Sequence, residues 1–184
     1  RKWGVKRVLM ANQVAGRQNL RELSLELTED PEFDFYLLAD SVENVEQLAE
    51  AAREQSLEKP IQLMVELGFP GGRTGCRDLK QALLVARRVK SLEPHLALRG
   101  IEGYEALLRS KPEPEKSVRE FLGNLNELVA LCSDEDLFSE GPVILSAGGS
   151  DFFDLVLQHL EGPSGKREVI RVIRSGCYLT HDSL

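Results

Sequence analysis

The chain has 184 residues, of which 42% are hydrophobic and 29% are charged, and its formal net charge is −7 at pH 7. Its length suits one domain with a sizeable core, and the composition is ordinary for a globular protein. The negative charge argues against a surface that binds nucleic acid or an anionic membrane, and no apolar run reaches the roughly 18 residues of a membrane span.

The three cysteines, Cys76, Cys132 and Cys177, lie far apart in the sequence. Their spacing predicts neither a disulfide framework nor a paired-cysteine metal site, and a reducing cytoplasm fits best. His181 stands beside Asp182, but no third ligand accompanies them, so we expect no metal site there. The first residues lack an initiator methionine and a signal-peptide pattern, so we expect the given sequence to begin inside a longer chain.

Six short apolar runs alternate with five segments of helical periodicity. The apolar runs lie at residues 5–10, 33–38, 61–67, 96–101, 143–145 and 168–174. The helical segments lie at 17–27, 41–52, 78–91, 117–132 and in a short stretch that ends at 157. The clearest helix has Ser41 as its N-cap, whereas residues 109–117 are expected to form a charged surface connection. Apolar runs without strict alternation predict strands buried on both faces, as in a parallel sheet.

Polar or glycine residues follow each predicted strand, beginning with Asn12 and Gln13, which we expect to cap a helix rather than to contact a ligand. Functional groups at the carboxyl ends of successive strands are typical of a (β/α)₈ barrel, whereas a doubly wound sheet gathers them at one switch point. The sequence therefore predicts an α/β fold of the TIM-barrel type. Six strands cannot close such a barrel, so we expect residues 1–184 to be one partial barrel domain.

The loop at residues 146–150 is the best candidate for an anion site. Gly148 and Gly149 would let backbone N–H groups approach an anion, and Ser150 would cap the following helix, whose N-terminus favours negative charge. The alternative is an ordinary β-to-α turn in which Ser150 or Asp151 is only the N-cap.

Five motifs occur together in a familiar order. They lie at residues 8–13 (VLMANQ), 71–75 (GGRTG), 98–104 (LRGIEGY), 145–150 (LSAGGS) and 174–178 (RSGCY). Together they resemble the D-threonine aldolase and D-serine dehydratase (amino-acid deaminase) branch of the alanine racemase-like, fold-type III pyridoxal phosphate enzymes. The resemblance covers nearly the whole chain and implies a pyridoxal 5′-phosphate barrel followed by a C-terminal β-domain.

The resemblance also implies which residues bind the cofactor ring. Arg73 would reach the phenolic oxygen of pyridoxal phosphate, although it could be a plain loop arginine. Tyr104 would lie near the ring, although it could simply pack on the barrel rim. Arg174 would lie near the pyridine nitrogen, and an arginine there keeps that nitrogen unprotonated, which restrains the cofactor as an electron sink.

The phosphate group would be bound by two loops. The resemblance assigns Gly148, Gly149 and Ser150 to one loop, and the backbone N–H groups of Gly176 and Cys177 to the other. Paired backbone donors at a helix start suit a dianionic phosphate.

Several features depart from the family pattern. The lysine that forms the Schiff base lies on the first strand of the family barrel, and we expect this chain to correspond to strands three to eight only. None of the lysines ends a predicted strand at the site; they are Lys2, Lys6, Lys59, Lys80, Lys90, Lys111, Lys116 and Lys166. The C-terminal β-domain of the family, with its divalent metal site, would also be absent.

We therefore expect a pyridoxal phosphate-dependent amino-acid lyase, either a deaminase (dehydratase) or an aldolase, acting on a D- or β-hydroxy-amino acid. The chain itself would be a fragment without the Schiff-base lysine and without activity of its own. The expected partners are a small amino-acid substrate and a second copy of the chain. Two alternatives stay open: a non-catalytic pyridoxal phosphate-binding protein, and a barrel enzyme that acts on a phosphorylated sugar.

Overall fold

The computed structural model describes residues 4–30, 32–148, 151–162 and 167–174. Along these residues, strands and helices alternate as the sequence predicts. The strands are β1 (Arg7–Met10), β2 (Asp34–Ala39), β3 (Ile61–Leu67), β4 (Leu96–Gly103), β5 (Val143–Ala147) and β6 (Val169–Ile173). The helices are α1 (Arg17–Glu29), α2 (Val42–Glu54), α3 (Leu79–Ser91), the 3₁₀ helix η1 (Ala106–Ser110), α4 (Pro114–Asp134) and α5 (Phe153–His159).

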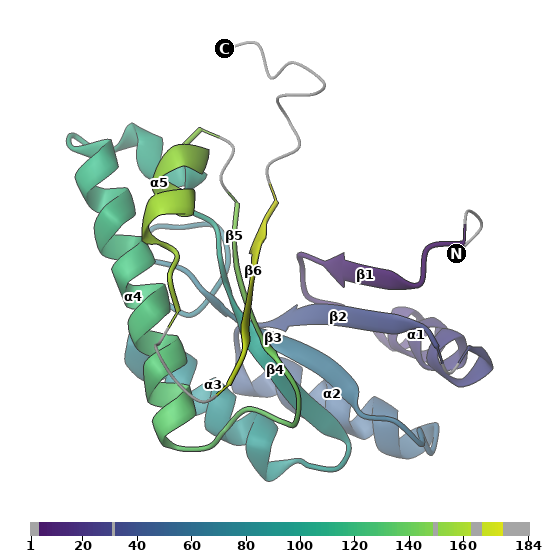
Figure 1. The fold of residues 1–184 in the computed structure, drawn as a ribbon. Coiled ribbons are helices and arrows are strands. Elements are labelled where there is room, and N and C mark those ends of the chain that lie inside the picture. Colours follow the sequence, from purple (N-terminus) through teal and green to yellow (C-terminus); the bar gives the residue numbers. More distant parts are fainter. Residues whose placement is uncertain (1–3, 31, 149–150, 163–166, 175–184) are drawn as a thin grey trace.

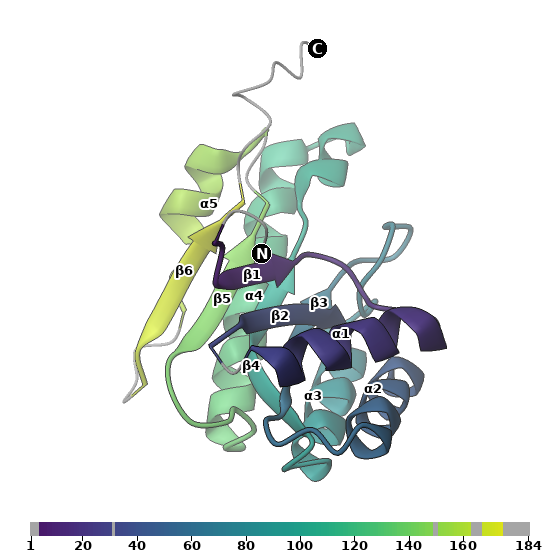
Figure 2. The ribbon, with the colours of Figure 1, turned by 90° about the vertical axis from the view of Figure 1, so that its right-hand side faces the viewer.

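All six strands are parallel, and each pairs with the next one along the chain, in the order β1-β2-β3-β4-β5-β6. Figures 1 and 2 show that the sheet is strongly curved and that the helices lie along its outer side. Each helix contacts the next in order, so α1 to α5 form one layer. This arrangement is a partial TIM-type barrel and confirms the predicted fold class.

The two faces of the sheet have different roles. On β3, Leu63 and Val65 belong to the core that packs against the helices, whereas Met64 and Glu66 alternate onto the inner face. β4 pairs with β3 so that Glu102 lies beside Glu66 on this inner face. The helices thus cover one side of the sheet, and polar side chains collect on the other side at the carboxyl ends of the strands.

The beginnings of the helices test the predictions from local sequence. Ser41 caps α2 by accepting a hydrogen bond from the N–H of Asn44 at 3.3 Å, which confirms that prediction. The fourth predicted helix begins earlier than expected: α4 starts at Pro114, and η1 precedes it, so residues 109–117 are not a simple surface connection. Proline suits the first helical position because its missing N–H is unpaired there in any case.

The prediction that Asp151 could be the N-cap of α5 is wrong, because the N-cap is Phe152, with no side-chain cap. Ser150, the other predicted cap, lies outside the described residues. Asp151 instead forms an ion pair with Arg109 at 3.3 Å. α5 has only seven residues, so a helix dipole adds little to an anion site here. Within the described residues, none of the helices is long and apolar enough to cross a membrane.

Candidate functional site

Residues that follow β3, β4 and β5 meet at the carboxyl ends of these strands. The guanidinium carbon of Arg73, in the loop after β3, lies 5.3 Å from the centre of the Tyr104 ring, which follows β4. Gly148, which follows β5, lies so close that an added Cβ would be 2.6 Å from Cδ2 of Tyr104. The structure therefore brings together three of the predicted cofactor residues. A cation over an aromatic ring is attracted by the negative face of that ring.

The backbone of Gly148 has a partner that the sequence does not predict. Its N–H donates a 3.0 Å hydrogen bond to Oε2 of Glu105, a fully buried carboxylate. The glycine is needed here because the Tyr104 ring and this carboxylate occupy the space that a Cβ would fill. The predicted contact between the Gly148 N–H and a phosphate would have to replace this bond.

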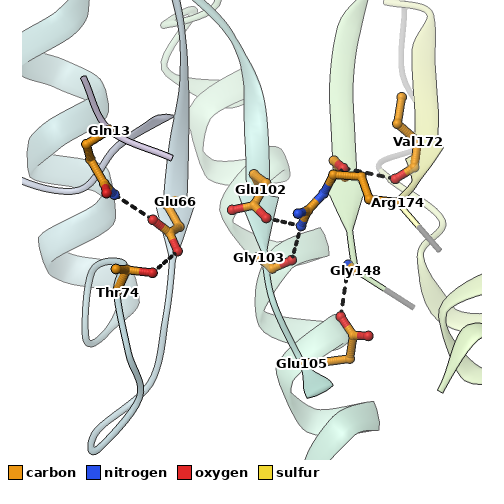
Figure 3. A network of polar contacts seen from close by, with 10 residues as sticks. Gln13, Glu66, Thr74, Glu102, Gly103, Glu105, Gly148, Val172 and Arg174 are labelled. Carbon is orange, nitrogen blue, oxygen red and sulfur yellow. Dashed lines mark hydrogen bonds and ion pairs between the residues drawn. The ribbon is translucent and has the colours of Figure 1, made fainter. Parts of the chain in front are cut away.

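Arg174, directly after β6, is held by groups on two neighbouring strands (Figure 3). Its Nε donates to Oγ of Ser146 at 3.0 Å, and its Nη2 donates to the carbonyl of Gly103 at 2.9 Å. Nη2 also forms a close ion pair with Oε1 of Glu102. The backbone N–H of Arg174 donates to the carbonyl of Ala147 at 3.1 Å. These bonds fix the guanidinium against the inner face of the sheet.

The carboxyl group of Glu102 has a strongly raised pKa. Its side chain is 1% exposed, and its Oε2 is buried without a hydrogen-bond partner among the described residues. Burial raises the pKa of Glu102 to about 8, the charge of Arg174 opposes this rise, and the carboxylates of Glu66 and Glu105 add to it. Such a perturbed carboxyl group is typical of functional sites.

Glu66, in contrast, has both of its oxygens paired. Oε2 accepts from Nε2 of Gln13 at 2.6 Å, and Oε1 accepts from Oγ1 of Thr74 at 2.5 Å (Figure 3). The prediction that Asn12 and Gln13 cap a helix is wrong, because α1 has Gly16 as its N-cap and no side-chain cap. Gln13 instead reaches across the sheet from the end of β1 to β3.

Four of the predicted cofactor residues, Gly149, Ser150, Gly176 and Cys177, lie outside the described residues. Their predicted contacts with a phosphate group stay predictions. The four others are described, and they divide into two contact groups at the same end of the sheet: Arg73 with Tyr104 and Gly148, and Arg174 with the ends of β4 and β5.

None of the described lysines lies on a strand or directly follows one. Lys6 precedes β1, Lys59 precedes β3, Lys111 follows η1, and the others are on the helices α3 and α4. The described residues also contain no group of three or more histidine, cysteine, aspartate or glutamate side chains that could hold a metal ion.

The three buried carboxylates Glu66, Glu102 and Glu105 are site residues that the sequence analysis does not predict. A signal was present, because Glu66 and Glu102 interrupt apolar strands at positions where a charge is costly unless it is paired. Strand alternation indicates only that such a residue points away from the helices. The partner of each carboxylate comes from a distant segment, which periodicity cannot identify.

Several of the solved structures that this chain resembles are longer proteins whose names describe enzymes. A D-threonine aldolase from Filomicrobium marinum superposes with a TM-score of 0.68 at 19% identity, covering 96% of this chain and 44% of that chain. A D-threo-3-hydroxyaspartate dehydratase from Delftia sp. HT23 gives a TM-score of 0.67 at 20% identity, covering 94% and 43%. The chain thus spans less than half the length of these two proteins. At such identities the likeness shows the fold.

A lysine/ornithine decarboxylase from Vibrio vulnificus has the same fold, with a TM-score of 0.58 at 10% identity, covering 90% of this chain and 43% of that one. No curated protein sequence matches this chain. The family model of the alanine racemase N-terminal domain matches residues 19–160, which include all the described site residues except Gln13 and Arg174. This match spans most of the chain, and the chain therefore belongs to the alanine racemase N-terminal domain family.

Proposed function

We propose that this chain is the cofactor-binding barrel portion of a pyridoxal phosphate-dependent amino-acid lyase that acts on a D- or β-hydroxy-amino acid. The observation that carries the proposal is the gathering of Arg73, Tyr104, Gly148 and Arg174 at the carboxyl ends of consecutive strands. Active sites of barrels of this type lie at that end. The names of the similar solved structures, an aldolase and a dehydratase of hydroxylated D-amino acids, support the substrate class.

The described residues fit such a cofactor. Two arginines supply positive charge for an anionic ring and phosphate, and the Cβ-free backbone of Gly148 allows close approach beside Tyr104. When bound, pyridoxal phosphate supplies an electron sink that stabilises negative charge at the α-carbon of an amino acid. Arg73 and Tyr104 would orient the ring, and Arg174 would donate to the ring nitrogen and so keep a proton off it.

The positions of the lysines favour a second candidate, a non-catalytic pyridoxal phosphate-binding protein. None of the described lysines lies on a strand or directly follows one, unlike the Schiff-base lysine that the family resemblance implies.

A homodimer is part of the proposal as well, because the described edges of β1 and β6 each carry backbone groups without a strand partner. Light scattering of the purified chain would test it, and twice the chain mass is the expected result.

Titration with pyridoxal phosphate followed by borohydride reduction tests the proposed function. We expect saturable binding, no cofactor linked to a specific lysine by mass spectrometry, and no turnover of D-threonine by this chain alone. Turnover of a phosphorylated sugar, with no affinity for pyridoxal phosphate, would overturn the proposal. One specifically labelled lysine together with turnover would show that the chain is catalytically complete.

A further inference from the structure

The contacts of Arg174 leave one end of its guanidinium open. Nε and Nη2 are engaged by Ser146, Gly103 and Glu102, whereas Nη1 has no partner among the described residues. The side chain is 20% exposed. Arginine carries five N–H donors in a rigid fork, so fixing two of its nitrogens also fixes the direction of the third. The donors of Nη1 are thus oriented before any ligand arrives.

Glu102 is the one acidic residue among the three described partners of the Arg174 side chain, and its surroundings do not suit a permanent negative charge. Oε2 is buried without a described partner, and an unpaired buried carboxylate oxygen is costly. The groups that face Glu102 from the neighbouring segments are Glu66 on β3, Glu105 after β4 and Arg174 after β6. Two of these three are carboxylates, and a proton on Oε2 would remove both the repulsion and the unpaired charge.

We propose that Glu102 is a positioning residue for Arg174, and that Glu102 takes up a proton from solvent when an anionic pyridine phosphate binds to the open end of that guanidinium. The inference rests on the proposed function and deepens it. With the carboxyl group neutral, the charge of Arg174 is no longer cancelled by its partner and is available to the ligand. The hydrogen bond from Arg174 to Oε1 remains, so the guanidinium keeps its place.

In this proposal Glu102 affects Arg174 in two ways, through the hydrogen bond that it accepts and through its negative charge. Substitutions can distinguish these two effects. Glu102→Gln imitates the protonated side chain, because its amide oxygen can still accept from Arg174. Glu102→Ala removes the hydrogen bond and leaves the guanidinium without its anchor. Glu120→Gln, an exposed position on α4, is the matched control. The probe is 4-deoxypyridoxine 5′-phosphate, which has the ring and phosphate of the cofactor but no aldehyde to react with surface lysines.

Calorimetric titration at pH 8 in two buffers of different ionisation enthalpy gives both Kd and the number of protons taken up. We expect the wild-type chain to take up about half a proton more per ligand than Glu102→Gln, because a group near its midpoint is half ionised. Glu102→Gln should bind at least as tightly as wild type at pH 8, whereas Glu102→Ala should bind about tenfold more weakly. Glu120→Gln should match wild type in both quantities.

Equal proton uptake by wild type and Glu102→Gln, with the ligand bound by both, would overturn the inference and leave the proposed function intact. No binding by the wild-type chain would overturn the proposed function instead. Should Glu102→Gln not fold, the wild-type Kd alone still tests the inference: it should weaken steadily between pH 7 and pH 9, and a constant Kd would contradict it.

Discussion

Tyr104 lies directly against the backbone of Gly148, so that a Cβ added to the glycine would be 2.6 Å from Cδ2 of the tyrosine. The two residues follow neighbouring strands, β4 and β5, and both are predicted to contact the cofactor. The ring position and the loop conformation are therefore coupled. A side chain at residue 148 has to displace either the ring or the loop.

Gly148→Ala should lower the free energy of unfolding by about 1–3 kcal/mol, the usual range for overpacking a filled site. It should also weaken binding of pyridoxal phosphate, because Tyr104 moves. Gly123→Ala is the matched control: Gly123 is exposed on α4 and nothing lies within 4 Å of its added Cβ. That change should stabilise the chain by about 0.5–1 kcal/mol. Urea unfolding measures both, and an unchanged stability of Gly148→Ala would contradict the described contact.

Thr74→Val should leave Oε1 of Glu66 without its donor. Because Glu66 is 4% exposed, water cannot readily replace the lost hydroxyl. The expected loss of stability is about 1–3 kcal/mol. Thr28→Val is the control: the Thr28 hydroxyl donates to the carbonyl of Ser24 within α1, and its loss should change stability by less than about 0.5 kcal/mol. Equal losses of stability for the two substitutions in urea unfolding would count against a stabilising hydrogen bond from Thr74 to Glu66.

The described cysteines should be unreactive in the folded chain. Burial raises the pKa of the Cys76 thiol to about 12 and that of Cys132 to about 12 as well. Only the thiolate is a nucleophile, so iodoacetamide at pH 8 should leave both unmodified until the chain is unfolded. Peptide mapping by mass spectrometry measures this, and rapid native labelling of Cys76 or Cys132 would show that the core around α3 and α4 opens.

Stability should depend on pH through Glu102 even without a ligand. The folded-state pKa of about 8 lies above the ordinary value of 4.5, so the folded chain binds this proton more tightly than the unfolded chain. The free energy of unfolding that this tighter proton binding contributes is fully present below pH 4.5. It is lost as the pH rises to about 8, by at most about 1.4 kcal/mol per pH unit. The difference in unfolding free energy between wild type and Glu102→Gln should fall over this window. A constant difference would contradict the described burial.

Much of the fold follows from local sequence. The alternation of apolar runs with helical periodicity predicts every strand, and β3 has the predicted bounds. Ser41 and Asp78 cap their helices as their residue types favour. The start of α5 could not be predicted in this way, because Asp151 pairs with Arg109, forty-two residues earlier in the chain. Tertiary contacts of this kind determine the residue at which such a helix begins.

The candidate site was only partly predictable for the same reason. Arg73, Tyr104, Gly148 and Arg174 stand at the ends of predicted strands, and a parallel sheet brings such positions to one edge. The hydrogen bonds from Arg174 to Glu102 and from Gly148 to Glu105 join residues 72 and 43 positions apart. Local patterns carry no information about which carboxylate meets which donor across that distance.

Equilibrium binding of 4-deoxypyridoxine 5′-phosphate to site variants tests the central claim most directly. The fluorescence titration compares wild type with Arg73→Gln, Arg174→Gln and the control Arg119→Gln, whose side chain lies on the exposed side of α4 and pairs with Glu115. We predict one saturable site in wild type and in the control, and at least tenfold weaker binding in both site variants. Binding that is equal in all four chains, or absent from the wild-type chain, would contradict the assignment of this strand-end site to a pyridine phosphate cofactor.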